Sequence, residues 1–120
     1  MSSTGGSLKG RWYGVAHAGG ILDMDGTPHL DHGFNCGSVT DIETGVAEIA
    51  LSNNLKTNSN IVGFANTIPV STAAQQFGFA EVQHNSTSAF RLSARKVDNN
   101  DDSMSVADVD NLMFCIWDLD

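Results

Sequence analysis

The chain has 120 residues, a formal net charge of −8 at pH 7 and 17% charged residues, with twelve glycines to serve turns. This length fits one domain, and the acidic balance argues against a nucleic-acid partner, because phosphates attract a surface rich in Lys and Arg. No apolar run approaches the roughly 20 residues of a membrane helix and no basic, apolar leader opens the chain, so we expect neither membrane insertion nor classical export.

Residues 1–10, MSSTGGSLKG, are small and polar and predict a flexible N-terminal arm. One interpretation makes the arm an attachment peptide that includes Ser3, Gly5, Gly6 and Leu8. The alternative is a plain disordered terminus. Residues 11–120 are predicted to form the folded domain.

The domain is predicted to consist of short strands joined by turns. The expected strands are residues 12–18, 21–24, 34–39, 46–51, 61–65, 67–70, 77–84, 89–96 and 111–117. Gly19-Gly20 would end the first strand, and Asn66 would mark a bulge or a tight bend. Asp25-Gly26 is a turn pair, as is Thr44-Gly45 in the hairpin after residue 39.

Helix signals are weak, because residues 71–76 offer one turn and residues 105–111 are too few for a stable helix. The density of strand and turn signals predicts an all-β fold. We expect a single-domain antiparallel β-sandwich or a jelly-roll-like arrangement.

The last predicted strand is apolar on both faces, whereas a half-exposed strand shows one polar row. One row would consist of Leu112, Phe114 and Ile116, and the other of Met113, Cys115 and Trp117. Either this is a central strand covered on its outer side by a loop, or one of the two rows belongs to a subunit interface. The residues predicted to form an interface or a core seam are Trp12, Tyr13, Leu112, Phe114, Ile116 and Trp117.

Two cysteines, Cys36 and Cys115, lie far apart in the sequence on predicted strands. They can pair only if those strands are neighbours. The simpler interpretation makes both of them small buried apolar residues.

Metal ligation has two weak candidates. His29 and His32 are spaced as HLDH around Asp31, but a structural zinc site needs four ligands. Asp23 and Asp25 resemble the opening of a calcium loop, without the glutamate that would complete it, and residues 98–102 are also acidic. Turn chemistry and solvation explain these residues, so we predict neither a metal nor a cofactor.

Catalytic motifs are absent from the sequence: there is no G-x-S-x-G elbow and no cysteine in a protease context. Glu43 falls in a predicted turn, while Glu48 and Glu81 alternate outward on strands, where solvated carboxylates are ordinary. We therefore predict that the protein is not an enzyme. Its aromatic side chains Trp12, Tyr13 and Trp117 could stack on sugar rings, although a buried position in a sandwich core explains them as well.

The segment 34–45, FNCGSVTDIETG, followed by an alternating strand, resembles a β domain at the C-termini of tailed-bacteriophage tail and fibre proteins. The aromatic segment 11–15 and the apolar segment 112–117 occupy matching places in that domain. The resemblance implies a virion surface component without catalytic residues, a homotrimer that contacts other virion proteins and takes part in host attachment through a host-surface glycan. The alternatives are a capsid decoration or head-fibre protein that stabilises the particle, and a stand-alone carbohydrate-binding module.

Overall fold

The computed structural model describes residues 16–56, 61–67, 76–98 and 103–119. In these residues it contains nine strands and no helix, which confirms the predicted all-β class. The strands are β1 (Ala18–Asp23), β2 (His29–Phe34), β3 (Cys36–Glu43), β4 (Val46–Leu51), β5 (Ile61–Thr67), β6 (Gln76–His84), β7 (Ala89–Asp98), β8 (Ser103–Val106) and β9 (Leu112–Asp118). The described ranges thus offer no helical segment that could cross a membrane.

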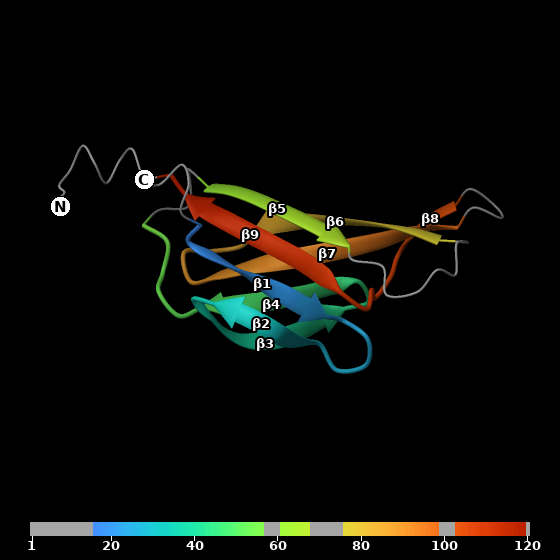
Figure 1. Cartoon of the computed structure of the whole chain (residues 1–120), viewed down its shortest axis with the longest axis horizontal. Coiled ribbons are helices and arrows are strands. Elements are labelled where there is room, and N and C mark those ends of the chain that lie inside the picture. Colours follow the sequence, from blue (N-terminus) through green and yellow to red (C-terminus); the bar gives the residue numbers. More distant parts are fainter. Residues whose placement is uncertain (1–15, 57–60, 68–75, 99–102, 120) are drawn as a thin grey trace.

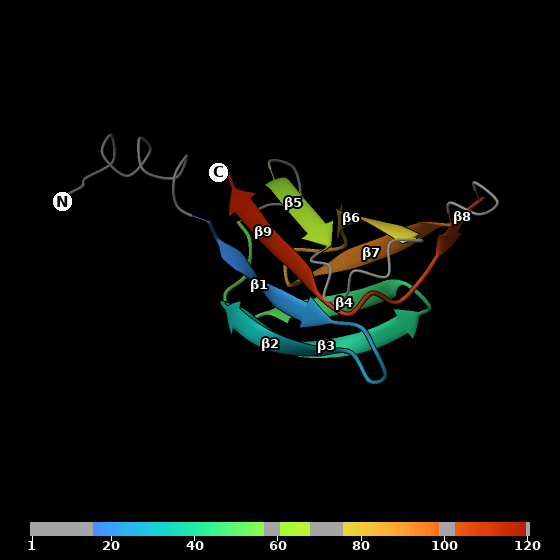
Figure 2. The same cartoon turned by 45° about the vertical axis from the view of Figure 1, so that its right-hand side comes forward.

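Two antiparallel sheets make up the fold (Figures 1 and 2). One has the strand order β2-β1-β9-β5, and the other has the order β3-β4-β7-β6, with β8 paired to the far part of β7. The sheets pack face to face, which confirms the predicted antiparallel β-sandwich.

The core lies between the sheets and draws alternate residues from both. In β4 the side chains of Ala47, Ile49 and Leu51 are buried, while the residues between them are half-buried. Phe90 of β7 meets Phe114 of β9 across the core, with ring centroids 5.5 Å apart and planes tilted by 51°. The period of two read from the sequence is therefore the period of burial.

Asn35 is the corner at which the chain crosses from one sheet to the other. Its φ of 55° lies in the left-handed region, which Asn tolerates better than most residues. Its side-chain Oδ1 accepts a hydrogen bond from the backbone N–H of Asn53 at 2.6 Å, and its Nδ2 donates one to the carbonyl of His17 at 2.9 Å. The strand expected over residues 34–39 therefore starts too early, since Phe34 ends β2 and Cys36 begins β3, while its predicted hairpin with residues 46–51 is confirmed by the antiparallel pairing of β3 with β4.

Gly19-Gly20 does not end a strand, contrary to expectation, but lies inside β1. A Cβ on Gly19 would come within 2.9 Å of the Phe114 carbonyl oxygen and of a ring carbon of Phe34. The glycines are thus required by close contact between strands rather than by a turn. The Asp25-Gly26 turn is confirmed, with φ of 72° at Gly26, and it joins β1 to β2, a strand that the sequence did not predict.

The other strand predictions have mixed outcomes. Strands close to those expected form β4, β6, β7 and β9, while β5 continues through the position of the expected bulge to Thr67. Part of the weak helical segment 105–111 belongs to strand β8. The predictions for residues 1–15, 68–75 and 99–102 lie outside the described residues.

Candidate functional site

The two rows of β9 have opposite environments. Leu112, Phe114 and Ile116 are at most 1% exposed and belong to the core. In the other row, Met113 is 46% exposed, and Cys115 and Trp117 are half-buried. β9 is central in its sheet, between β1 and β5, and within the described part of the chain its outer row is partly open to solvent.

Apolar residues of neighbouring strands continue this outer row across the sheet. The ladders place Ile21 beside Met113, Phe64 beside Cys115 and Val62 beside Trp117. Phe34 stands beside Gly19, which is in turn paired with Cys115. We call this surface the outer apolar face; it comprises Ile21, Phe34, Val62, Phe64, Met113, Cys115 and Trp117.

The most exposed members of the outer apolar face are aromatic. Phe64 is 65% exposed and Phe34 is 50% exposed. The Phe64 ring meets the Trp117 ring edge to face, at 5.8 Å between centroids and 79° between planes. The buried Trp117 indole N–H has no hydrogen-bond acceptor among the described residues, so this tryptophan is fixed by packing alone.

The outer face of the other sheet is polar over β4, β6 and β7, as a solvated sheet surface should be, although Met104 and Val106 of β8 are exposed apolar residues. Arg91 donates from Nε to Glu48 Oε1 at 3.1 Å, and Asn85 donates to the same oxygen at 2.7 Å. Ser93 donates to Glu81 at 3.3 Å. Glu48 and Glu81 are thus engaged on this outer surface, where the sequence analysis expected ordinary solvated carboxylates.

A shallow hollow of about 260 Å³ lies over β6, β7 and β8. Its lining residues are Ala80, Glu81, Ser93, Arg95 and Met104. Among the described residues, its lining includes one carboxylate, that of Glu81, and one guanidinium, that of Arg95.

The predicted site residues are divided by the structure. Leu112, Phe114 and Ile116 are core residues, and Trp117 belongs to the outer apolar face. Trp12 and Tyr13, and the arm residues Ser3, Gly5, Gly6 and Leu8, lie outside the described residues.

The two cysteines are unpaired thiols, and both are half-buried. Cys36 lies at the start of β3 and packs against the core, whereas Cys115 belongs to the outer apolar face. Burial raises the pKa of the Cys36 thiol above its ordinary value, so this cysteine stays protonated at neutral pH. Its position fits the predicted role of a small buried side chain.

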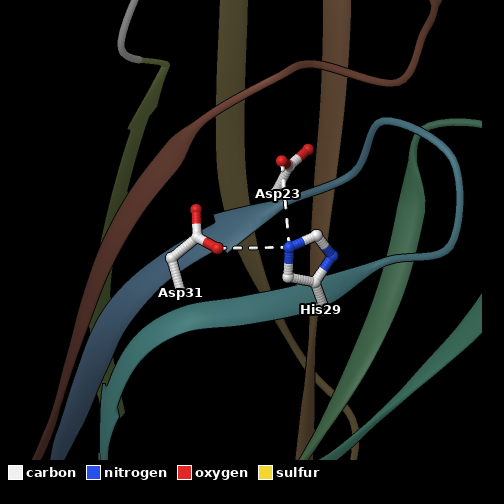
Figure 3. A group of neighbouring side chains, drawn as sticks. All are labelled: Asp23, His29 and Asp31. Atoms are coloured by element: carbon white, nitrogen blue, oxygen red, sulfur yellow. Dashed lines mark ion pairs between the residues drawn. The ribbon is translucent and has the colours of Figure 1, made fainter.

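A second feature of the same sheet is a group of three polar side chains at the β1–β2 hairpin, drawn in Figure 3. His29 Nε2 lies 3.1 Å from Asp31 Oδ1 and 3.9 Å from Asp23 Oδ2. The ladder pairs Asp23 with His29, and Asp31 is the extra residue of a β-bulge between the partners of Ile21 and Leu22. His29 and Asp31 are two residues apart on β2, so the alternation of side chains along the strand places both on the same side of the sheet.

The hydrogen bonds around this Asp23/His29/Asp31 cluster orient its members. The Nδ1 of His29 lies 3.0 Å from the carbonyl oxygen of Thr27, and because a carbonyl only accepts, Nδ1 carries the proton. This hydrogen bond is the largest cause that raises the pKa of His29 above 6.5. Desolvation, the next largest, opposes it, and the charges of Asp31 and Asp23 add to the rise. The backbone N–H of Asp25 donates to Asp23 Oδ1 at 2.8 Å, which leaves Oδ2 facing the imidazole.

The sequence analysis identified only part of this cluster. It grouped His29 with His32 and Asp31, whereas the structure brings Asp23 to His29 and leaves exposed His32 beside Ile21 in the ladder. The missed signal was the Asp25-Gly26 turn: taken as the centre of a hairpin, it places Asp23 and His29 on paired strands.

Comparison of the chain with protein-family models, with curated proteins and with solved structures found no match. The resemblance to phage tail and fibre domains therefore remains a prediction from the sequence.

Proposed function

We propose that this protein is a non-catalytic structural subunit of a tailed-bacteriophage virion, a fibre-like or tail-associated surface component that takes part in host attachment. In this proposal it assembles with further copies of itself through the outer apolar face. The exposed apolar surface over β2, β1, β9 and β5 is the observation that carries the assembly. The assignment to a virion rests on the sequence resemblance of residues 34–45.

The energetic argument begins with the exposed aromatics. A phenylalanine buries about 200 Å² when fully enclosed, so Phe64 at 65% and Phe34 at 50% exposure present about 130 and 100 Å² of mainly apolar area. At about 25 cal/mol per Å², covering these two side chains is favourable by up to about 6 kcal/mol per copy. Monomeric sandwiches normally turn polar rows outward, as β4 and β7 of the opposite sheet do with Glu48, Arg91 and Ser93.

The outer apolar face is smaller than a standard interface. β9 has seven residues, about 23 Å at 3.3 Å per residue, and four strands at about 4.8 Å span about 19 Å. The flat footprint is about 440 Å², below the roughly 800 Å² per partner of a standard interface. A cyclic trimer would divide this face between two neighbours, so the area does not set the number of copies; the homotrimer is part of the proposal because the resemblance implies it.

The test is the solution mass by light scattering, compared between wild type and Phe64→Glu. Wild type should have three times the 12.7 kDa of one chain, and Phe64→Glu should be a folded monomer, because a charge then replaces the most exposed aromatic ring of the contact. Met104→Glu is the matched control: Met104 is also an exposed apolar residue, at 57%, but it lies on β8 of the other sheet. It should keep the wild-type mass.

Salt sharpens this test, because each copy carries a charge of −8 and mutual repulsion opposes assembly at low ionic strength. Assembly should therefore strengthen from 20 mM to 500 mM NaCl. A wild-type monomer at every salt concentration, or an unchanged mass in Phe64→Glu, would overturn the assembly proposal. Binding of fluorescent wild-type protein to a panel of bacterial cells tests host attachment, and its absence would favour the particle-stabilising alternative.

A further inference from the structure

We infer that Asp23, His29 and Asp31 form a binding site for one divalent transition-metal ion of the Zn²⁺ type. The inference does not depend on the proposed function, because all three residues belong to one hairpin of one chain. It is carried by the convergence of three ligand atoms of mixed chemistry, one imidazole nitrogen and two carboxylate oxygens, within 4.8 Å of one another.

The distances suit a small ion. With metal–ligand bonds of about 2.0–2.2 Å, neighbouring ligand atoms of a tetrahedral site lie about 3.3–3.6 Å apart. The His29 Nε2 distances of 3.1 Å to Asp31 and 3.9 Å to Asp23 lie on either side of that value. The carboxylate oxygens of Asp23 and Asp31 lie within 4.8 Å of each other, so the exposed side chains must draw together around the ion to complete the site.

The cluster is also prepared for a cation by its hydrogen bonds. The imidazole proton on Nδ1 is directed to the Thr27 carbonyl, so neutral His29 turns the lone pair of Nε2 toward the two carboxylates. Metal-ligating histidines typically donate their other ring N–H in this way. Asp23 is held similarly, because its Oδ1 accepts the Asp25 N–H while its Oδ2 faces His29 Nε2 at 3.9 Å.

The ligand types decide the class of metal. The two carboxylates give the cluster a formal charge of −2. When His29 is neutral, its Nε2 and the two carboxylate oxygens all present lone pairs to one another, and a positive ion between them relieves this repulsion. An imidazole ligand favours Zn²⁺ and its transition-metal neighbours over Ca²⁺ and Mg²⁺, which prefer oxygen ligands alone. His29 and Asp31 have side chains 55% and 41% exposed, so water can complete the coordination.

The test is calorimetric titration of ZnCl₂ into tag-free protein that has been stripped with EDTA and dialysed. Wild type should bind one Zn²⁺ per chain, while His29→Gln and Asp31→Asn should each lose roughly tenfold or more in affinity. His32→Gln is the matched control, since it removes an exposed imidazole of the same strand outside the cluster, and it should bind as wild type does. A rise in melting temperature with Zn²⁺ should appear only in the proteins that bind.

Two outcomes would overturn the inference: no saturable binding by wild type, or equal affinity in wild type and His29→Gln. In either case the cluster is an ion pair between a protonated imidazole and two carboxylates. Phe64→Glu should bind Zn²⁺ as wild type does, so a failure of the assembly proposal and a failure of the metal site are separately observable.

Discussion

Replacement of Phe114 by Ala tests the division of β9 into a core row and an outer row. Phe114 is 1% exposed and packs against Phe90 at 5.5 Å, in the centre of the sandwich. Met113 is its neighbour in the chain and points to the opposite side, where it is 46% exposed. Met113→Ala is therefore the matched substitution on the same strand.

The expected magnitudes differ widely. Removing a buried Phe side chain destabilises a core by about 3–5 kcal/mol, because it loses the transfer free energy and leaves a cavity. This is a large fraction of the roughly 5–15 kcal/mol by which a domain is stable. Met113→Ala removes a side chain already about half in water, so within an isolated chain we expect a loss of about 1 kcal/mol.

Urea unfolding followed by tryptophan fluorescence measures both changes. With a slope of about 2 kcal/mol per M, Phe114→Ala should lower the midpoint by about 2 M and Met113→Ala by about 0.5 M. If copies assemble through the outer apolar face, the Met113→Ala loss should grow at high protein concentration, because the assembled state is linked to folding by mass action. Equal losses for both variants at every protein concentration would refute the assignment of the two rows.

Two further predictions concern a turn and a titrating group. Gly45→Ala should lower the free energy of unfolding by more than the roughly 1 kcal/mol that a left-handed alanine costs, because at φ of 78° the new Cβ would lie 2.8 Å from the Ala94 carbonyl oxygen. Gly26→Ala is the control, since Gly26 has a φ of 72° and a Cβ there would have no atom within 4 Å. In urea unfolding it should show the conformational cost alone. In EDTA-treated protein, NMR titration should give His29 a pKa above 6.5, and this pKa should fall in Asp31→Asn. The stabilisation from the protonated imidazole is then fully present below pH 6.5 and is lost as the pH rises through the raised pKa. An unchanged pKa in Asp31→Asn would contradict the pairing of His29 with Asp31.

The strands that the sequence predicted are those whose burial alternates. β6 and β7 have apolar residues at a period of two, and β9 was recognised as apolar on both sides. β2, with the sequence HLDHGF, was missed because four of its six residues are His, Asp or Gly. It is an edge strand in which every residue except Leu30 is exposed. Such a strand is fixed by its hairpin partner rather than by its own pattern.

The limits of prediction at the two candidate sites have a common cause. The apolar residues of β9 were visible, but Phe34, Phe64 and Ile21 join them only through the pairing of strands distant in sequence. Asp23 reaches His29 only because β1 and β2 pair as a hairpin. Sequence periodicity describes one strand at a time, whereas both sites depend on how strands are aligned side by side.

The pairing of β1 with β9 determines how the sandwich responds to tension. These first and last described strands are antiparallel neighbours, and Ala18 is paired with Ile116, so the chain enters and leaves the sheet at the same end (Figure 1). A pull between Ala16 and Leu119 therefore opens the ladder one residue pair at a time, beginning at Ala18 and Ile116, instead of shearing all of its hydrogen bonds together. Force applied across the sheet face, instead of between the two ends of the chain, does not pull on the β1–β9 ladder.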